Sequence, residues 1–341
     1  MKRLAAALMF LLVTMPGGPL LALDDPPGQR LKVALALSFD RQEDRWSRDL
    51  DAMRAYAEAH GIELMVEVAR NNQMQQNSQI TRLLARNPAV LILTPHDGAG
   101  AAAAVRKARD LGVKVISYDR LVMNAPVDIY VTFDNEMVGE LQASCLVKAV
   151  PRGEYVILSG APGDGNSRQF LAGAMKVIRP LADSGLIKVA AEDAIIDWQP
   201  ATALEIMRKI LAGGVRPDAV LAPNDPTAGA VIQALADYGL AGSVPVTGQD
   251  AELEAARRLV AGTQSMTVFK DTRLLGAKAM ELAVKLAAGE SLEEAGVRPA
   301  PIGKALVPAY MLTPVAVTRD NLKETLIESG YLTEKDVFGA E

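Results

Sequence analysis

The sequence is poor in the residues that most catalytic and metal-binding sites need. Its 341 residues include one cysteine, Cys145, and two histidines, His60 and His96. A single cysteine excludes a disulfide within the chain, and neither histidine has companions at metal-ligand spacing. No serine is paired with a histidine in a recognisable motif, so nucleophilic catalysis finds little support. We therefore expect a protein that is not an enzyme and that uses no metal or cofactor.

Positive charge and aromatic side chains are also scarce. The net charge is −5 and no stretch is rich in Lys or Arg, so we expect no nucleic-acid partner. Aromatic residues make up only 4% of the chain, so its cores must consist mainly of Ala, Val, Leu and Ile, which suits helices packed on parallel strands. Because 341 residues exceed what one core usually serves, we expect two lobes.

The N-terminus has the pattern of a secretory signal. Two basic residues, Lys2 and Arg3, precede an apolar run over residues 4–14 and a Pro-Gly-Gly breaker. That run is well short of the roughly 20 residues that span a bilayer. We expect residues 1–22 to be a signal peptide that is removed, and the mature protein to lie in the periplasm.

From residue 31 onward, short aliphatic runs alternate with stretches of helical period, which indicates βαβ units and parallel sheets. The predicted fold is α/β, with two doubly wound parallel-sheet lobes. The expected strands are residues 31–37, 63–68, 89–93, 113–117, 130–133, 155–159, 187–191, 219–222, 244–247 and 265–269. The expected helices are residues 43–59, 75–85, 101–111, 137–149, 167–182, 201–211, 227–238, 272–288 and 321–329, while 289–304 is expected to be a loop.

Polar residues follow most of the predicted strands, and ligands of open parallel sheets bind outside the carboxyl ends of the strands. Carboxylates accept hydrogen bonds from sugar hydroxyls, and Arg, Lys and Asn supply the reciprocal donors. The two tryptophans, Trp46 and Trp198, also fall in such segments, and a flat ring suits the C–H face of a sugar. The polar candidates are Arg45, Asp119, Arg120, Asn166, Asn224, Asp225, Asp250 and Lys270.

Each candidate also has a purely structural interpretation. Neighbours such as Asp119 and Arg120 point to opposite faces of a regular strand, so both reach one ligand only if the strand has ended. Asn166, Asn224 and Asp225 precede predicted helices and could be N-caps; we expect Asn166 and Asn224 to bind ligand and Asp225 to cap. Trp46 could be a core residue, and Lys270 a surface one.

At these positions the chain resembles the periplasmic D-xylose-binding proteins of bacterial sugar ABC transporters, over about residues 31–338. The stretches that carry the resemblance are Arg45-Trp46, Tyr118-Asp119-Arg120, Phe133-Asp134-Asn135-Glu136, Asn224-Asp225, Gly248-Gln249-Asp250 and residues 262–268. The resemblance implies the type I periplasmic binding protein fold, with a three-segment hinge. It implies an N-terminal lobe of residues 30–135 and 268–300, and a C-terminal lobe of residues 136–267 and 301–341.

The resemblance also implies a site and a function. A monosaccharide, first of all D-xylose, would be captured between two closing lobes and delivered to an ABC permease by a monomeric protein. Alternatives are another pentose or hexose, a sugar sensor serving a chemoreceptor or kinase, a LacI-type regulator and an enzyme on a related scaffold. The residues implied to contact sugar hydroxyls are Arg45, Asp119, Arg120, Asn166, Asn224, Asp250 and Lys270. Trp46 and Trp198 are implied to pack on the ring.

Two positions differ from the family pattern. Phe39 stands where xylose binders carry an acidic residue, and the segment around His96 stands where they have a Tyr-Asn pair. We expect Phe39 and His96 at the edge of the pocket, where they bear on which sugar is taken.

Overall fold

The computed structural model describes residues 30–39, 44–302 and 305–339. The expected signal peptide, residues 1–22, lies outside these ranges. Among the described residues, no helix is both long and apolar enough to cross a membrane.

The N-terminal lobe contains a seven-stranded sheet in the order β10-β11-β5-β4-β3-β1-β2. All pairings are parallel except that of β10 with β11. Its strands read as continuous apolar runs because both faces are covered, as in Val90–Leu93, where every residue is buried. The strands are β1 (Lys32–Leu37), β2 (Glu63–Val68), β3 (Val90–Leu93), β4 (Lys114–Tyr118), β5 (Ile129–Phe133), β10 (Arg298–Ile302) and β11 (Ala305–Leu312).

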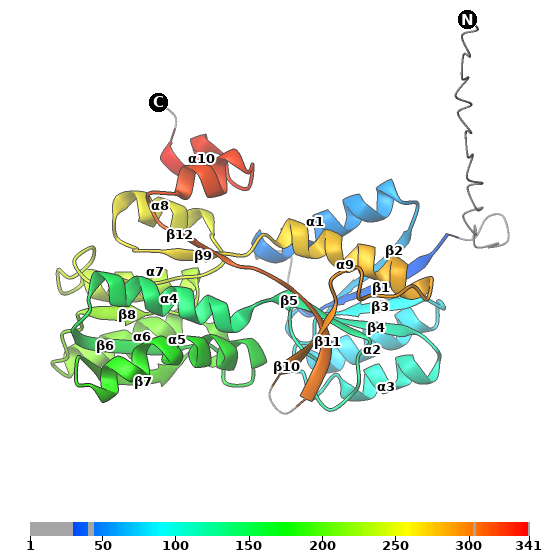
Figure 1. Ribbon diagram of the computed structural model, residues 1–341, viewed down its shortest axis with the longest axis horizontal. Coiled ribbons are helices and arrows are strands. Elements are labelled where there is room, and N and C mark those ends of the chain that lie inside the picture. Colours follow the sequence, from blue (N-terminus) through cyan, green and yellow to red (C-terminus); the bar gives the residue numbers. More distant parts are fainter. Residues whose placement is uncertain (1–29, 40–43, 303–304, 340–341) are drawn as a thin grey trace, which may run out of the picture. The chain divides into compact units, whose positions relative to one another are not determined.

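Two pairs of helices cover the two faces of this sheet (Figure 1). Successive side chains of a strand alternate in direction, so Val33 and Leu35 pack with α1 and α9, while Ala34 and Ala36 pack with α2 and α3. The expected alternation of strands and helices is confirmed here. The helices are α1 (Asp44–Ala59), α2 (Gln73–Leu84), α3 (Ala102–Asp110) and α9 (Thr272–Ala287).

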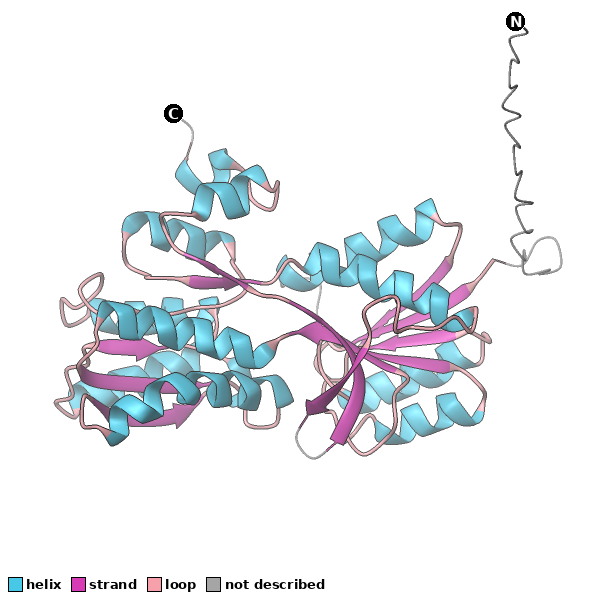
Figure 2. Ribbon diagram, in the orientation of Figure 1, coloured by secondary structure: helices cyan, strands magenta, loops and turns pink. Residues whose placement is uncertain are grey.

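The C-terminal lobe repeats the arrangement around a three-stranded parallel sheet in the order β7-β6-β8 (Figure 2). Helices α4 and α5 share one apolar cluster with this sheet, and α6 and α7 share the other. A Cβ on Gly173 of α5 would lie 1.9 Å from the Glu136 carbonyl oxygen of α4, so this glycine permits the close packing of the two helices. The elements are β6 (Gly153–Ser159), β7 (Ile187–Ala194), β8 (Ala219–Leu221), α4 (Asn135–Ala149), α5 (Gly165–Asp183), α6 (Pro200–Ala212), α7 (Asp225–Ala236) and the 3₁₀ turn η1 (Ile196–Trp198).

Over the residues that the structure describes, the chain crosses between the lobes three times. It crosses between β5 and α4, between β9 (Thr267–Phe269) and α9, and between β11 and β12 (Val315–Val317). Strands β9 and β12 pair antiparallel, so two of the crossings lie side by side. The three-segment hinge of the type I periplasmic binding protein fold is thus present.

The structure corrects three predicted segments. Residues 305–312, expected in the C-terminal lobe, form β11, which pairs with β5 in the sheet of the N-terminal lobe before the chain crosses. Residues 298–302, expected to be loop, form β10, an edge strand that tolerates its two prolines since an edge leaves N–H positions unused. Residues 244–247 form only one bridge, from Val246 to Val220, because Pro245 has no N–H to donate.

The C-terminal segment packs on the C-terminal lobe. Leu322, Leu326 and Tyr331 join a cluster with Leu259 and Phe269. The terminal helix expected at residues 321–329 is a short π-helical stretch, η2 (Lys323–Glu328), and two further helices were not predicted, α8 (Leu253–Ala261) and α10 (Glu334–Phe338).

Candidate functional site

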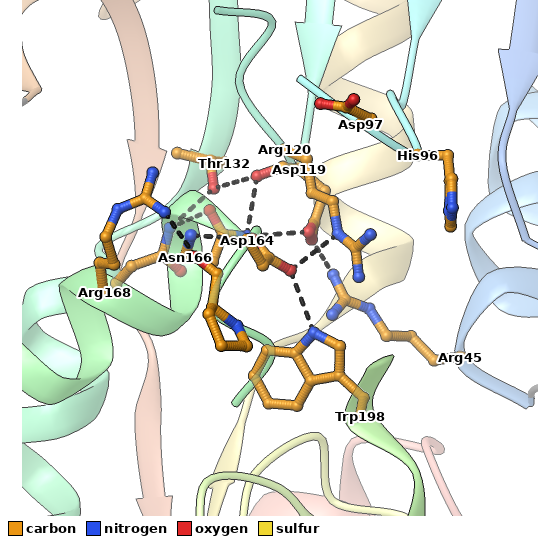
Figure 3. A network of polar contacts seen from close by, with 12 residues as sticks. Arg45, His96, Asp97, Asp119, Arg120, Thr132, Asp164, Asn166, Arg168 and Trp198 are labelled. Atoms are coloured by element: carbon orange, nitrogen blue, oxygen red, sulfur yellow. Dashed lines mark hydrogen bonds and ion pairs between the residues drawn. The ribbon is translucent and has the colours of Figure 1, made fainter. Parts of the chain in front are cut away.

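A cavity of about 730 Å³ lies among the loops that follow the strands of both lobes. This volume falls in the range of small-molecule sites. The residues expected to contact the sugar or to edge the pocket all line it, whereas Asp225, expected to cap a helix, does not: the lining includes Phe39, Arg45, Trp46, His96, Asp119, Arg120, Asn166, Trp198, Asn224, Asp250 and Lys270. The sequence therefore located the wall of the cavity, and Figure 3 shows part of that wall.

Asp119 reaches the cavity because β4 has already ended at Tyr118. Its φ of 60° is in the left-handed region, which turns the chain so that both Asp119 and Arg120 line the cavity. The Tyr130 and Thr132 hydroxyls donate to the Asp119 carbonyl oxygen at 2.7 and 3.1 Å and hold this turn. The strand has thus ended before Asp119 and Arg120, which is the condition for both side chains to reach one ligand.

The Asp119 carboxylate is buried among positive charges. Oδ2 pairs with Arg45 Nη2, and Oδ1 accepts from Asn166 Nδ2 at 3.2 Å. Burial alone would raise the pKa of Asp119, but the charges of Arg45, Lys270 and Arg120 outweigh it and hold the pKa below its usual range. Asp119 is therefore a permanent acceptor at neutral pH.

A second carboxylate, Asp250, lies between two cations. Its Oδ1 is 3.0 Å from Lys270 Nζ and 3.3 Å from Arg45 Nη1. Lys270 is only 2% exposed, and burial together with repulsion from Arg45 lowers its pKa. Asp250 has φ 93°, another left-handed conformation held at the site. The surface interpretation of Lys270 is thus excluded.

The amide of Asn166 contacts protein groups through both its nitrogen and its oxygen. Its Nδ2 donates to both the carbonyl oxygen and the carboxylate of Asp119, at 3.1 and 3.2 Å. Its Oδ1 accepts from Asn135 Nδ2 at 3.1 Å and lies 3.2 Å from the Tyr130 hydroxyl, whose single hydrogen is donated over the shorter distance to the Asp119 carbonyl oxygen. Both donors of the amide are thus in use, so Asn166 can donate to a ligand only by exchanging one of these partners.

Asp164, not Asn166, is the N-cap of α5. Its Oδ1 accepts from the Asn166 backbone N–H at 2.9 Å, and its Oδ2 accepts from Trp198 Nε1 at 3.2 Å. The same Oδ2 is 3.0 Å from Arg120 Nε (Figure 3). From the sequence, Asp164 was noted only as a polar residue in the loop after a predicted strand; the helix begins at Gly165, two residues before the predicted start at 167, which makes Asp164 its cap.

The aromatic wall contains a residue that the sequence placed only at the edge. Phe39 stacks on Trp46 with ring centroids 4.0 Å apart and planes within 5°. The Arg45 guanidinium lies 4.5 Å from the Trp46 centroid, and that of Arg120 lies 4.4 Å from the Phe39 centroid. Trp46 is only 6% exposed, so Phe39 and Trp46 act as one stacked unit.

Trp198 forms a separate wall. A Cβ on Gly160 would lie 2.0 Å from its ring, so only glycine allows the indole to rest on the backbone there. The ring meets the edge of Phe170 at a centroid distance of 6.3 Å. Trp198 has φ 58°, and the contacts with Gly160, Phe170 and Asp164 hold it in that conformation.

The expected roles of Asn224 and Asp225 need one correction. Asn224 is the N-cap of α7, in a capping box with Thr227, and it also lines the cavity. Asp225 does not cap: its carboxylate is buried and accepts from Gln264 Nε2 and Thr267 Oγ1 at 2.8 and 2.9 Å. Burial raises the pKa of Asp225 to about 7. Asn224 is the cap because α7 begins at Asp225, and the N-cap is the residue just before the first helical one.

His96 lies in the cavity wall near Asp97. Its backbone N–H donates to Gln76 Oε1 at 3.2 Å, and its ring Nδ1 is buried without a hydrogen-bond partner. Among the described residues, no group of three or more His, Cys, Asp or Glu side chains is placed to hold a metal ion. The site instead offers donors, acceptors and flat apolar faces in one cavity, which is the chemistry of a neutral polyhydroxylated ligand.

Comparison with known proteins identifies the family. A model described as the periplasmic binding protein domain matches residues 35–291. The chain belongs to the periplasmic binding protein family. Members of this family bind solutes and are not enzymes, in agreement with the prediction from composition.

Relatives of this periplasmic binding protein support the resemblance drawn from the sequence. It is 41% identical to a D-xylose-binding periplasmic protein of Escherichia coli, over 91% of this chain and 93% of that protein. It is 42% identical to the D-xylose-binding periplasmic protein of Haemophilus influenzae, over 90% of this chain and 92% of that protein. The family predicted from the residues is thus confirmed.

A solved structure agrees with the fold. A carbohydrate transporter solute-binding protein of Chloroflexus aurantiacus, in complex with D-glucose, superposes on this periplasmic binding protein with a TM-score of 0.83. The two share 34% identity over 90% of this chain and 98% of that one.

Proposed function

We propose that this periplasmic binding protein captures a monosaccharide, with D-xylose as the first candidate, between its two lobes and delivers it to an ABC permease. The observation that carries the proposal is the convergence of the carboxylates of Asp119 and Asp250, three cations and two aromatic walls on one cavity. Asp119 and Arg45 come from the N-terminal lobe, and Asp250 from the C-terminal lobe.

The proposed contacts follow from the chemistry of each group. Asp119 and Asp250 accept from ring hydroxyls, while Arg45, Arg120 and Lys270 donate to them, in charge-assisted bonds that are roughly twice as strong as neutral ones. The apolar C–H faces of the sugar rest on Trp198 and on the Phe39–Trp46 stack. Asn166 and Asn224 contribute amide groups, and Asn166 donates to the sugar by exchanging a present partner of its Nδ2.

The mechanism is a ligand-driven shift between an open and a closed form. Each lobe carries part of the polar set, so a sugar satisfies both parts only when the lobes are closed. A ligand shifts such an equilibrium by its differential affinity for the two forms. Micromolar affinity corresponds to about −8 kcal/mol, which several charge-assisted bonds and two ring faces supply after ordering costs.

The relatives guide the choice of sugar. The names of the two relatives above state D-xylose, whereas the Chloroflexus protein holds D-glucose. A relative of Azospirillum brasilense, 37% identical over 93% of this chain and 92% of that protein, is a multiple sugar-binding periplasmic protein. D-xylose is therefore the first expectation, and another pentose or hexose is the second.

We place the mature protein in the periplasm as a monomer, after removal of residues 1–22. A thermal-shift screen over about twenty sugars, including D-xylose, ribose, arabinose, galactose and glucose, tests the proposal. We expect D-xylose to raise the melting temperature most. If no sugar raises it, the proposal is wrong.

A further inference from the structure

The backbone that carries Asp250 is strained. Asp250 and its neighbour Ala251, in the loop of residues 248–252 (the Asp250 loop), have φ angles of 93° and 52°. Both lie in the left-handed region, which is unfavourable for residues other than glycine and persists only where the surroundings hold it. From this loop the Asp250 carboxylate faces Lys270 and Arg45. Contacts behind the cavity wall must therefore hold the loop.

The carboxylate of Asp225 lies behind the Asp250 loop and is fully buried at the first residue of α7. Its oxygens accept from Gln264 Nε2 at 2.8 Å, from Thr267 Oγ1 at 2.9 Å and from the Glu252 backbone N–H at 3.0 Å. We propose that Asp225 is a positioning residue, which holds this loop in the conformation that presents Asp250 to a sugar. Its effect on sugar affinity rests on the proposed function, whereas its effect on the loop does not.

Asp225 is connected to the Asp250 loop on both sides of the left-handed pair. Before the pair, the Asp225 backbone N–H donates to the Gln249 carbonyl oxygen at 3.0 Å. After it, Asp225 Oδ2 accepts from the Glu252 N–H. The same Oδ2 accepts from Thr267 Oγ1, which in turn accepts from the Ala251 N–H at 3.2 Å. Asp225 therefore fixes the ends of the pair directly and its second residue through Thr267.

The neighbours of Asp225 require an acceptor at both of its oxygens. Gln264 cannot reverse its amide, because its Oε1 accepts from Arg258 Nε at 2.8 Å and its Nε2 also donates to the Met266 carbonyl oxygen at 3.0 Å. On the other side, the Glu252 N–H can only donate. A carboxylate accepts at both oxygens, whereas an amide presents an NH₂ group at one of them. Asparagine at position 225 would therefore set that group against a donor in either orientation.

The first test is Asp225→Asn, which keeps the shape of the side chain and changes its polarity. Measurements are made at pH 8, because burial raises the pKa of Asp225 to about 7 and the network needs the ionised carboxylate. Hydrogen exchange is recorded without sugar for the Ala251 amide and for the amides of β6 in the same lobe. We expect exchange at Ala251 to rise at least tenfold more than exchange in β6.

A second variant and a matched control separate the loop from overall stability. Thr267→Val removes the hydroxyl that links Asp225 to Ala251 and should give the same local rise; it decides the question if Asp225→Asn is poorly folded. The control is Ile178→Ala, in the apolar cluster between the sheet and helices α4 and α5, which contains none of the network. This variant lowers the stability of the lobe, so exchange at Ala251 and in β6 should rise together.

A polarity swap gives a test that a merely structural role would not pass. In Asp225→Asn with Gln264→Glu, the new amide donates to the new carboxylate, and its oxygen still accepts from the Glu252 N–H. Only the bond to the Met266 carbonyl oxygen is lost. We expect the double variant to reverse most of the rise in Ala251 exchange, although Gln264→Glu alone sets two carboxylates against each other.

Sugar affinity links the loop to the site. Asp225→Asn should raise the Kd for D-xylose about tenfold, and the double variant should bind at least threefold more tightly than Asp225→Asn. Exchange at Ala251 that only follows β6, a polarity swap without recovery, or a Kd within twofold of the original in a loosened variant would each overturn the proposal. If the unsubstituted protein binds no sugar, the proposed function fails, and the sugar-free exchange still decides whether Asp225 holds the loop.

Discussion

Replacing Trp198 with alanine separates the ligand-binding wall from the fold. The indole rests on Gly160, meets the edge of Phe170 and donates to Asp164 at 3.2 Å. It lies after β7 in the turn η1, outside the sheet and its covering helices. Its removal therefore takes away a face of the cavity and loses packing against one small cluster that includes Phe170 and Met266, while the clusters between the sheets and their helices do not contain it.

The expected loss follows from the area of that face. Aromatic contacts are worth about 0.5–1.5 kcal/mol beyond area burial, and roughly 40 Å² of sugar C–H surface adds about 1 kcal/mol at 25 cal/mol per Å². A total of about 2 kcal/mol raises the Kd roughly 30-fold. Trp198→Phe keeps a ring and loses the hydrogen bond to Asp164, so its Kd should lie between those of the unsubstituted protein and Trp198→Ala.

Isothermal titration calorimetry with D-xylose measures the Kd of the unsubstituted protein and of each variant. Circular dichroism of each variant checks that the fold is intact. The chain has two tryptophans, so the change in emission on sugar binding in the unsubstituted protein, compared with Trp198→Phe, reports the contribution of Trp198. A Kd for Trp198→Ala within twofold of the original would refute its assignment as a wall of the sugar site.

Three further predictions concern the rest of the site. Lys270→Met leaves Asp250 without its 3.0 Å partner and should lower the free energy of unfolding by about 3 kcal/mol in urea titrations; a loss below about 0.5 kcal/mol would contradict the buried ion pair. Phe39→Ala unstacks Trp46 and should weaken sugar binding about tenfold and shift the tryptophan emission to the red; an unchanged spectrum would argue against the stack. Burial raises the pKa of Asp49 to about 7, so this carboxyl is protonated in the folded protein and ionised in the unfolded chain between about pH 4 and 7. The stability that Asp49 contributes is therefore lost as the pH rises. Between pH 5 and 8 the unfolding free energy of the unsubstituted protein should fall by about 2–3 kcal/mol more than that of Asp49→Asn. Equal falls in the two proteins would show that Asp49 does not cause this pH dependence.

Much of the fold could be predicted because local pattern and tertiary environment agree. The strand at residues 63–68 was predicted with the bounds that β2 has, since its aliphatic run is flanked by clear helical periods. Prediction failed where proline decided the outcome. Pro245 limited residues 244–247 to a single bridge, whereas the prolines of β10 were tolerated because that strand lies at the edge of the sheet.

The residues that line the cavity could be predicted from the sequence, but the contacts between their side chains could not. Residues after parallel strands converge by topology, so all the polar candidates named from the sequence except Asp225 line one cavity. Which side chain pairs with which depends on contacts between the lobes. The stack of Phe39 on Trp46, the contacts of the Asn166 amide with Asp119 and the three partners of Asp164 have no signature in sequence spacing.

Titration of D-xylose into the purified mature protein by isothermal calorimetry measures directly whether the cavity binds a sugar. We expect one binding site per chain with a Kd in the micromolar range or below. Absence of binding heat at two temperatures with D-xylose and with each of the comparison sugars would contradict it.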